Sequence, residues 1–176
     1  TGCCNVAIGR SALCSNTTAN QNTALGYQAM LSTTTGYSNT AIGHGALDTM
    51  TTAYNNNAIG VDCLRSCTTG VQNTANGKDA LAALTTGNHN TAIGTYAGSN
   101  VTTGGSNVFI GLYAGVGQVT TGHDQLYIAR SSTAKGNAPT WIYGNGSGEC
   151  QQGSNSSTWL TSSDKRLKKD IVDNTV

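Results

Sequence analysis

Asparagine recurs at a fixed interval of 17 residues along most of the chain. The series is Asn5, Asn22, Asn39, Asn56, Asn73, Asn90 and Asn107, and Asp124 takes the eighth position. A side-chain amide carries both donors and an acceptor, so amides stacked at equivalent positions can hydrogen-bond to one another along a column. We therefore interpret the seven asparagines as a structural ladder that runs along a stack of equivalent coils.

Other residue types that carry chemistry show no comparable pattern. The six cysteines contain no paired C-x-x-C groups of a zinc site, and the eight acidic residues form neither repeated calcium-binding coils nor an evident pair for glycoside cleavage. Cys63 stands where most repeats have alanine, which favours a buried free thiol, whereas the state of the other cysteines stays open. We expect no cofactor and no metal site.

Composition limits the class of protein. The chain of 176 residues has one Phe, one Pro, 23 Gly and 10% charged residues. Its large apolar side chains are too few for a conventional core. Regularly spaced Thr and Ile nevertheless argue against disorder. The net charge of +1, with one basic cluster at 165–169, gives poor support for nucleic-acid binding. No stretch is apolar for long enough to span a membrane, so we expect no membrane insertion.

The repeat itself predicts strands and turns. Counted from each Asn, position 4 is apolar in most coils, position 8 is small, and position 9 is Leu or Met until Gly98 and Gly115 replace them. The Ala-Ile-Gly run at positions 3–5 predicts a strand with one packed face, and Thr-Thr-Gly predicts a turn in which Gly takes a positive φ. No helical apolar face persists. The position 4 residues are Ile8, Leu25, Ile42, Ile59, Ile93, Ile110 and Tyr127.

We therefore predict an all-β solenoid of about eight coils over residues 1–130, on the order of 40 Å long at the spacing of neighbouring strands. Such narrow coils bury little, so we expect several chains to pack along a common axis as a parallel homotrimer. Asn76 interrupts the apolar column at position 4. If buried, its amide needs partners, and we hypothesise that it fixes the register of the chains or forms an axial ion site.

Two kinds of fibrous protein resemble this sequence. The Asn-Thr-Ala-Ile-Gly coils resemble the heads of trimeric autotransporter adhesins and, more closely, phage tail-fibre-like proteins that end in an S74-type intramolecular chaperone. Residues 124–129 (DQLYIA) with 141–144 (WIYG) are similar to a passage that precedes such chaperones. Residues 163–171 (SDKRLKKDI) are similar to the opening motif S-D-x-R-L-K-x-D-I of the chaperone. Together these segments cover almost the whole chain.

The resemblance implies a division of the chain and a self-cleavage reaction. Residues 1–130 would be the shaft, 131–162 an irregular β-rich neck, and 163–176 the start of the chaperone, with more of the polypeptide expected beyond both ends. Ser163 would be the nucleophile and Lys168 its base, with scission next to Ser163. A hydroxyl needs such a base, and a Lys can serve if burial lowers its pKa. The thirteen residues that follow Ser163 are too few for a working protease, so we expect no enzyme unless the full domain is present.

The expected function is mechanical and adhesive. We expect the shaft of a viral or phage tail fibre or spike, located on a virion or cell surface, with itself and a host receptor or glycan as partners. A bacterial trimeric adhesin or surface appendage is the alternative. Tyrosines and tryptophans could offer sugar-stacking faces, but packing of turns explains them better. An ice-binding face is less well supported, because adjacent Thr residues point to opposite faces.

Overall fold

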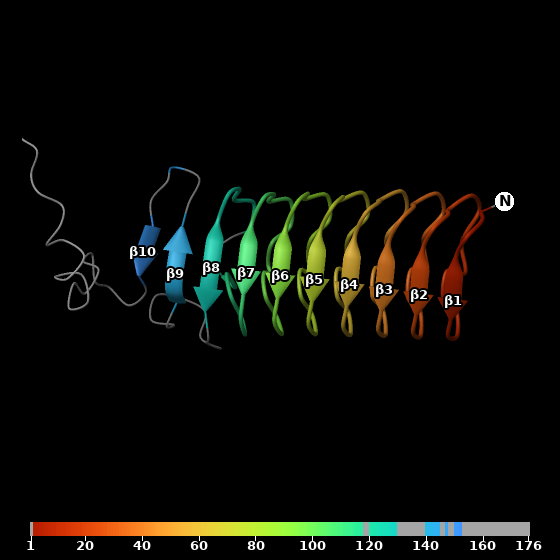
Figure 1. Ribbon diagram of the computed structural model, residues 1–176, viewed down its shortest axis with the longest axis horizontal. Coiled ribbons are helices and arrows are strands. Elements are labelled where there is room, and N and C mark those ends of the chain that lie inside the picture. Colours follow the sequence, from red (N-terminus) through yellow and green to blue (C-terminus); the bar gives the residue numbers. More distant parts are fainter. Residues whose placement is uncertain (1, 118–119, 130–139, 145–146, 148–149, 153–176) are drawn as a thin grey trace, which may run out of the picture.

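The chain forms a parallel β-solenoid of about seven turns, so the all-β solenoid prediction is confirmed (Figure 1). The computed structural model describes residues 2–117, 120–129, 140–144, 147 and 150–152, and no helix occurs in them. One sheet runs in the order β1 to β10; its first eight strands are parallel and β9 and β10 are antiparallel. The strands are β1 (Val6–Ile8), β2 (Thr23–Leu25), β3 (Thr40–Ile42), β4 (Asn57–Ile59), β5 (Thr74–Asn76), β6 (Thr91–Ile93), β7 (Val108–Ile110), β8 (Leu126–Ala129), β9 (Thr140–Gly144) and β10 (Cys150–Gln152).

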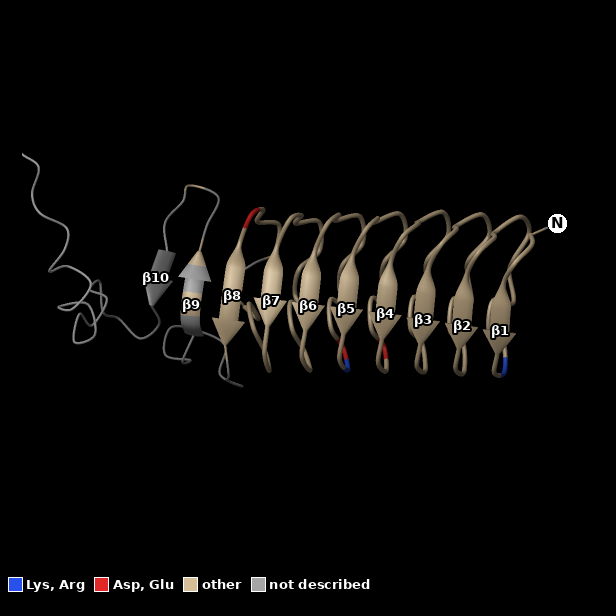
Figure 2. Cartoon of the chain, in the orientation of Figure 1, with Lys and Arg blue, Asp and Glu red and all other residues tan. Residues whose placement is uncertain are grey.

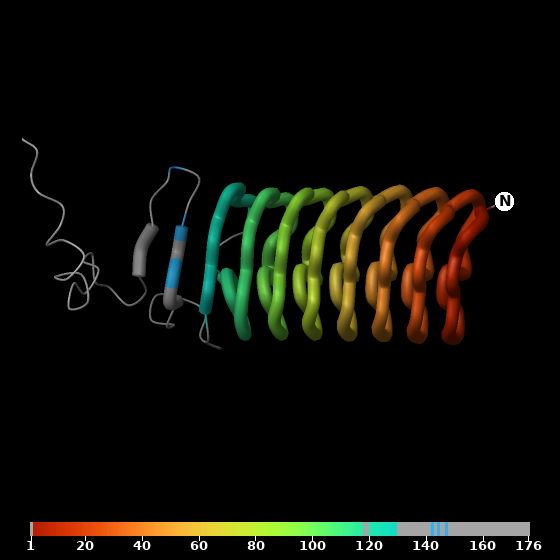
Figure 3. The backbone as a smooth tube through the Cα atoms, in the orientation of Figure 1, coloured from red at the N-terminus to blue at the C-terminus, as the bar shows by residue number. Residues whose placement is uncertain are grey.

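One repeat of the sequence makes one coil of the solenoid. The parallel pairs from β1 to β7 match residues that lie 17 positions apart, such as Ala24 with Ala41 and Ile59 with Asn76. Each of these strands has only three residues, and the remainder of the coil returns on the other side, as the tube in Figure 3 shows. Like residues therefore stack directly on like residues along the whole shaft.

Left-handed backbone conformations close each coil at positions 5, 7, 9 and 17. Position 5 requires glycine: Gly60 has φ 138, and a Cβ there would lie 2.5 Å from the carbonyl oxygen of Gly77. Positions 7, 9 and 17 hold other residues, such as Asp62 (φ 53), Leu64 (φ 51) and Gln72 (φ 58). An isolated chain avoids this region, so the neighbouring coils must hold these residues in place.

The prediction of a positive φ for the glycine of the Thr-Thr-Gly turn was wrong. Positive-φ glycines occur at position 5 and at a few other sites, but Gly36 and Gly70 of the Thr-Thr-Gly turns are not among them. Position 15 is small because space is limited: a Cβ on Gly36 would lie 2.5 Å from the carbonyl oxygen of Ala53 in the next coil.

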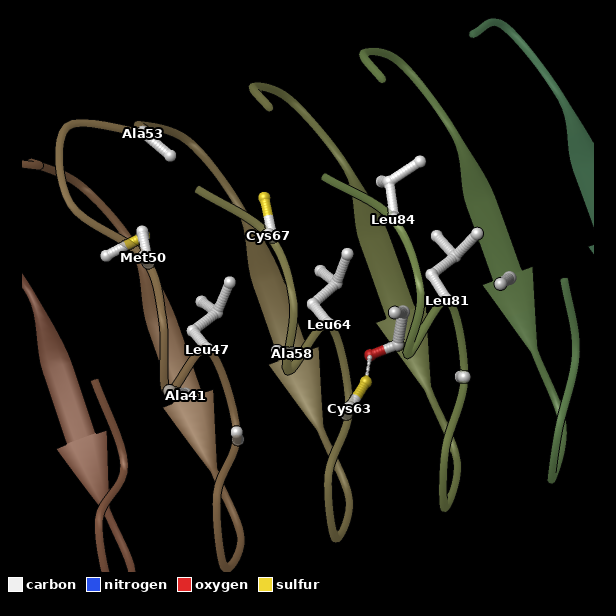
Figure 4. Packing of buried hydrophobic residues seen from close by; sticks show 14 of the residues in the cluster. Ala41, Leu47, Met50, Ala53, Ala58, Cys63, Leu64, Cys67, Leu81 and Leu84 are labelled. Carbon is white, nitrogen blue, oxygen red and sulfur yellow. Dashed lines mark hydrogen bonds between the residues drawn. The ribbon is translucent and has the colours of Figure 1, made fainter. Parts of the chain in front are cut away.

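The core lies between the strand and the returning half of each coil. Side chains at positions 3, 8, 9 and 12 point into it; Figure 4 shows Ala41, Leu47 and Met50 of one coil beside Ala58 and Leu64 of the next. This interior is narrow, so the strand contributes only the Ala of position 3 in most coils. Stacking the coils makes one continuous core out of these small contributions.

The sequence predicted one packed face for the strand, and the structure shows that this face holds position 3. Side chains of the position 4 column point outward, because positions 3 and 4 lie on opposite faces of a strand. Ile8, Leu25 and Ile93 are 59%, 42% and 47% exposed. The narrow interior has room for the Ala side chain and not for the larger Ile.

Phe109 marks the first coil in which an aromatic residue replaces the Ala of position 3, and Tyr127 follows at the equivalent place in β8. Phe109 is fully buried, while Gly98 and Gly115 replace Leu at position 9 in its own and the preceding coil. A Cβ on Gly98 would lie 2.7 Å from Phe109 Cδ2, and a Cβ on Gly115 would overlap the same ring. The aromatic ring therefore fills the volume that leucines fill in the earlier coils.

The last complete coil is one residue longer than the others. The backbone N–H of Gln125, not that of Asp124, donates to Asn107 Oδ1 at 2.9 Å, a separation of 18 residues. Asp124 was therefore wrongly placed at the eighth position of the series. Tyr127 pairs with Phe109 and Ile128 with Ile110, so Ile128, and not Tyr127, continues the column at position 4. Of the expected neck at 131–162, the structure describes β9, β10 and Ser147, and the proposed domain boundaries stay predictions.

Candidate functional site

The asparagine series forms a continuous hydrogen-bonded column inside the stack. Asn39 is typical: its backbone N–H and its Nδ2 both donate to Asn22 Oδ1, at 3.0 and 3.1 Å, and Nδ2 also donates to the carbonyl of Ala53 at 3.0 Å. Six of the seven asparagines are almost fully buried. Because protein partners occupy both the donors and the acceptor, this column is a scaffold and leaves little capacity for a ligand.

A second ladder, of threonine hydroxyls, follows position 13. The Oγ1 of Thr51 donates to the carbonyl of Thr68 at 3.3 Å, and Thr85 Oγ1 donates to the carbonyl of Thr102 at 3.0 Å. The threonines of position 14, which follow them in each Thr-Thr pair, are exposed. The available signal was the unbroken run of Thr at position 13 from Thr17 to Thr102.

The outward side of β1–β8 forms an uncharged surface that we call the outer sheet face. It consists of positions 2 and 4 of each strand, and β1–β8 contain no charged residue (Figure 2). Its position 4 column, here named the isoleucine ridge, contains Ile8, Leu25, Ile42, Ile59, Asn76, Ile93, Ile110 and Ile128. A sheet face that stays in water normally carries polar and charged side chains, whereas contiguous apolar columns on a surface mark interaction sites.

Asn76 lies exposed on this face instead of in the core. It occupies β5 between Ile59 and Ile93 in the ridge, and Thr74 of the same strand and Asn57 of β4 are exposed beside it. Within a single chain its amide therefore reaches water. Whether the amide acts in register or ion binding depends on what covers the outer sheet face.

Aromatic side chains stack in columns along the turns. Tyr27 stacks on His44 with centroids 5.2 Å apart and has Arg10 over its other face at 5.8 Å. Tyr96 stacks on Tyr113 at 4.8 Å, with Lys78 Nζ 5.3 Å from the centroid of Tyr96. Sugar stacking needs an open ring face, and neighbours cover both faces of Tyr27 and Tyr96. This geometry favours the packing interpretation of these tyrosines.

Cysteines fall into a buried and an exposed set. Cys63 and Cys67 are fully buried and free, which confirms the prediction for Cys63; its Sγ contacts the carbonyl of Ala75 at 3.3 Å (Figure 4). Desolvation raises the pKa of Cys63 to about 12 and that of Cys67 to about 11, so neither thiol ionises near neutral pH. The exposed free cysteines are Cys3, Cys4 and Cys14.

The remaining titratable side chains of the described residues do not gather into a cluster. His44 Nδ1 lies 3.9 Å from Asp62 Oδ1, and desolvation raises the pKa of nearby Asp48 while Arg65 opposes that rise. No three His, Cys, Asp or Glu side chains of the described residues gather as metal ligands. Nor does any helix there have the length and apolarity to cross a membrane. Ser163 and Lys168 lie outside the described residues.

Comparisons of the chain with family models, curated proteins and solved structures returned no match. The class that the fold defines is a single-sheet parallel β-solenoid with internal amide and hydroxyl ladders.

Proposed function

We propose that the chain is the structural shaft of an extracellular fibre, with a viral or phage tail fibre or spike as the first choice. The observation that carries this proposal is the stack itself: one coil repeats without a break, and its buried amides bond each coil to the next. A column of this kind transmits load along its axis and presents little loose backbone to proteases. The function would be to hold an attachment surface at a distance and to support binding to a host surface.

Self-association through the outer sheet face is part of the proposal. A strand of three residues is about 10 Å long, so the solenoid of a single chain is a thin rod with a small core. Packing the uncharged face of one copy against others would cover the isoleucine ridge and thicken the shaft. The resemblance to trimeric fibres makes a parallel homotrimer the preferred assembly.

The terminal motif supports a fibre that is assembled by a chaperone. By its resemblance, residues 163–176 open a chaperone domain in which Ser163 and Lys168 would cut the chain next to Ser163. The intact mass of the full-length gene product, compared with its Ser163→Ala variant, tests this step. Scission in the parent that disappears in the variant supports it, and a parent of full mass contradicts it.

A bacterial surface adhesin or appendage is the second candidate. The Asn-Thr-Ala-Ile-Gly coils favour it, because the same solenoid could serve as the head of a trimeric adhesin. A membrane anchor encoded downstream in the full gene would select this alternative. Genes for a baseplate or capsid next to it would select the viral fibre.

Light scattering coupled to size-exclusion chromatography tests self-association. We expect three times the chain mass of 18.0 kDa for the parent chain. Ile93→Lys places a charge in the isoleucine ridge and should dissociate the assembly, because burying an unpaired charge is strongly unfavourable. Thr103→Lys adds the same charge at an exposed position outside the outer sheet face and should leave the mass unchanged. A monomeric parent would contradict the assembly.

A further inference from the structure

The regularity of the solenoid creates a problem of register for any assembly. Because the coils from β1 to β7 repeat every 17 residues, sliding one copy along another by one coil brings nearly the same side chains into contact. In an all-apolar ridge, the aligned and the displaced arrangements would have almost equal free energies. A specific fibre therefore needs a feature that breaks this equivalence.

The isoleucine ridge contains one such feature near its middle. Asn76 is its single polar residue, and it stands where each of the other seven strands has Ile or Leu. The position 2 column beside it is polar from β2 to β6, with Asn57 as its single Asn among threonines, and Asn57 and Thr74 are exposed next to Asn76.

We propose that Asn76, supported by Asn57, sets the axial register between copies of this chain that pack along their outer sheet faces. This inference rests on the proposed self-association. In the aligned arrangement the amides of neighbouring copies meet and can satisfy one another as donor and acceptor. A displacement by one coil places Asn76 against Ile59 or Ile93 of the neighbour and leaves a buried amide without a partner.

The structure shows that Asn76 is not required for the coil itself. The backbone of β5 keeps the regular ladder, since Gly77 N–H donates to the Ile59 carbonyl and Gly94 N–H donates to the Asn76 carbonyl, both at 2.8 Å. The neighbouring strands hold Ile at the equivalent position with the same register. Asn76→Ile should therefore fold as well as the parent, so its effect on assembly can be read separately.

The expected effect is a preference between registers. An unsatisfied buried amide favours the aligned arrangement by roughly tenfold to a hundredfold. Asn76→Ile should abolish this preference while it keeps, or strengthens, self-association. Moving the amide one coil along, with Asn76→Ile and Ile93→Asn together, should restore alignment between identical chains.

Disulfide cross-linking between ridge positions reads the register directly. The full chain would carry Ser in place of Cys3, Cys4, Cys14 and Cys150, and two chains of different mass would carry Leu25→Cys or Ile42→Cys. A disulfide needs Cβ atoms about 3.8 Å apart, which is less than the spacing of about 4.8 Å between coils. Aligned copies therefore cross-link chains with the same substitution, and copies displaced by one coil cross-link the two different chains.

With Asn76 present we expect cross-links between identical substitutions only. With Asn76→Ile we expect both products at similar yields, and the relocated pair should return to identical products. A mixture of the parent with the relocated chain should give the displaced product. If Asn76→Ile chains stay aligned, the proposal is overturned and other parts of the chain fix the register. A parent that light scattering shows to be monomeric overturns this inference together with self-association.

Discussion

Phe109 fills core space that Gly98 and Gly115 leave open, and this arrangement gives the most quantitative test of the packing. Phe109 is fully buried, and Phe→Ala substitutions in cores cost about 3–5 kcal/mol because they lose apolar contact and leave a cavity. The cavity should be poorly filled here, since Gly98 and Gly115 supply no side chains next to it. We expect Phe109→Ala to lower the free energy of unfolding by an amount in this range.

Gly98→Leu alone should also destabilise the chain. Its Cβ would lie 2.7 Å from Phe109 Cδ2 and 2.9 Å from Leu81 Cδ2, and overpacking of this kind costs about 1–3 kcal/mol. Combined with Phe109→Ala, however, the leucine would enter the space that the ring left. The backbone permits it, because Leu81 occupies the equivalent position with φ 50, close to the φ 60 of Gly98. The double variant should therefore recover stability, with a coupling energy of about 1–3 kcal/mol.

Urea unfolding followed by far-UV circular dichroism measures this cycle on the full chain. Hydrogen exchange at β6–β8 would show whether the loss is local, since repeat proteins can open coil by coil. Leu112→Ala is a matched control from the same coil: the side chain is 42% exposed, and its loss should change stability much less. Additive effects of Phe109→Ala and Gly98→Leu would refute the volume-exchange argument.

Three further predictions address the ladders, the buried thiols and the turn glycine. Asn39→Ala removes the acceptor of the Asn56 N–H and the donor to the Ala53 carbonyl, so the free energy of unfolding measured in urea should fall by about 2–4 kcal/mol. Asn100→Ala, at an exposed site, should have little effect. Because burial raises the pKa of Cys63 to about 12 from its ordinary value of 9.0, the unfolded chain loses that proton first, and stability should fall as pH rises above 9.0. Cys63→Ala should flatten that part of the pH profile, and an unchanged profile would show that the thiol does not control it. Gly60→Ala combines a φ of 138 with a 2.5 Å approach to the Gly77 carbonyl, so it should lower the midpoint of thermal unfolding strongly; an unchanged midpoint would contradict the close stacking of the turns.

The stack of coils could be predicted from the asparagine period, but the face of each strand that points into the core could not. The alternation of Ala41 and Ile42 predicted one packed face but not which of the two side chains lies on it, because a three-residue strand does not reveal which face is covered. The volume of the interior decides this, and it depends on the returning half of the coil. The pairing of Phe109 with Gly98 and Gly115 was visible in the sequence, but its meaning required the structure.

Two local features escaped sequence reasoning for physical reasons. Leu64 and Gln72 adopt left-handed conformations that residue type does not signal, because the stack imposes them against intrinsic preference. The 18-residue coil was missed because Asp124 resembles Asn and fits the strict period. Comparing Leu126-Tyr127-Ile128 with Val108-Phe109-Ile110 would have located the insertion, since an aromatic residue stands at the centre of each strand.

Cryo-electron microscopy of the assembled full-length gene product tests the central claim that this chain is a fibre shaft. The account predicts a straight shaft of constant width, in which coils follow one another every 4.8 Å or so along the axis and several copies pack with their outer sheet faces inward. Isolated single-chain rods, or copies that contact one another through the turns while the isoleucine ridge stays in solvent, would contradict it.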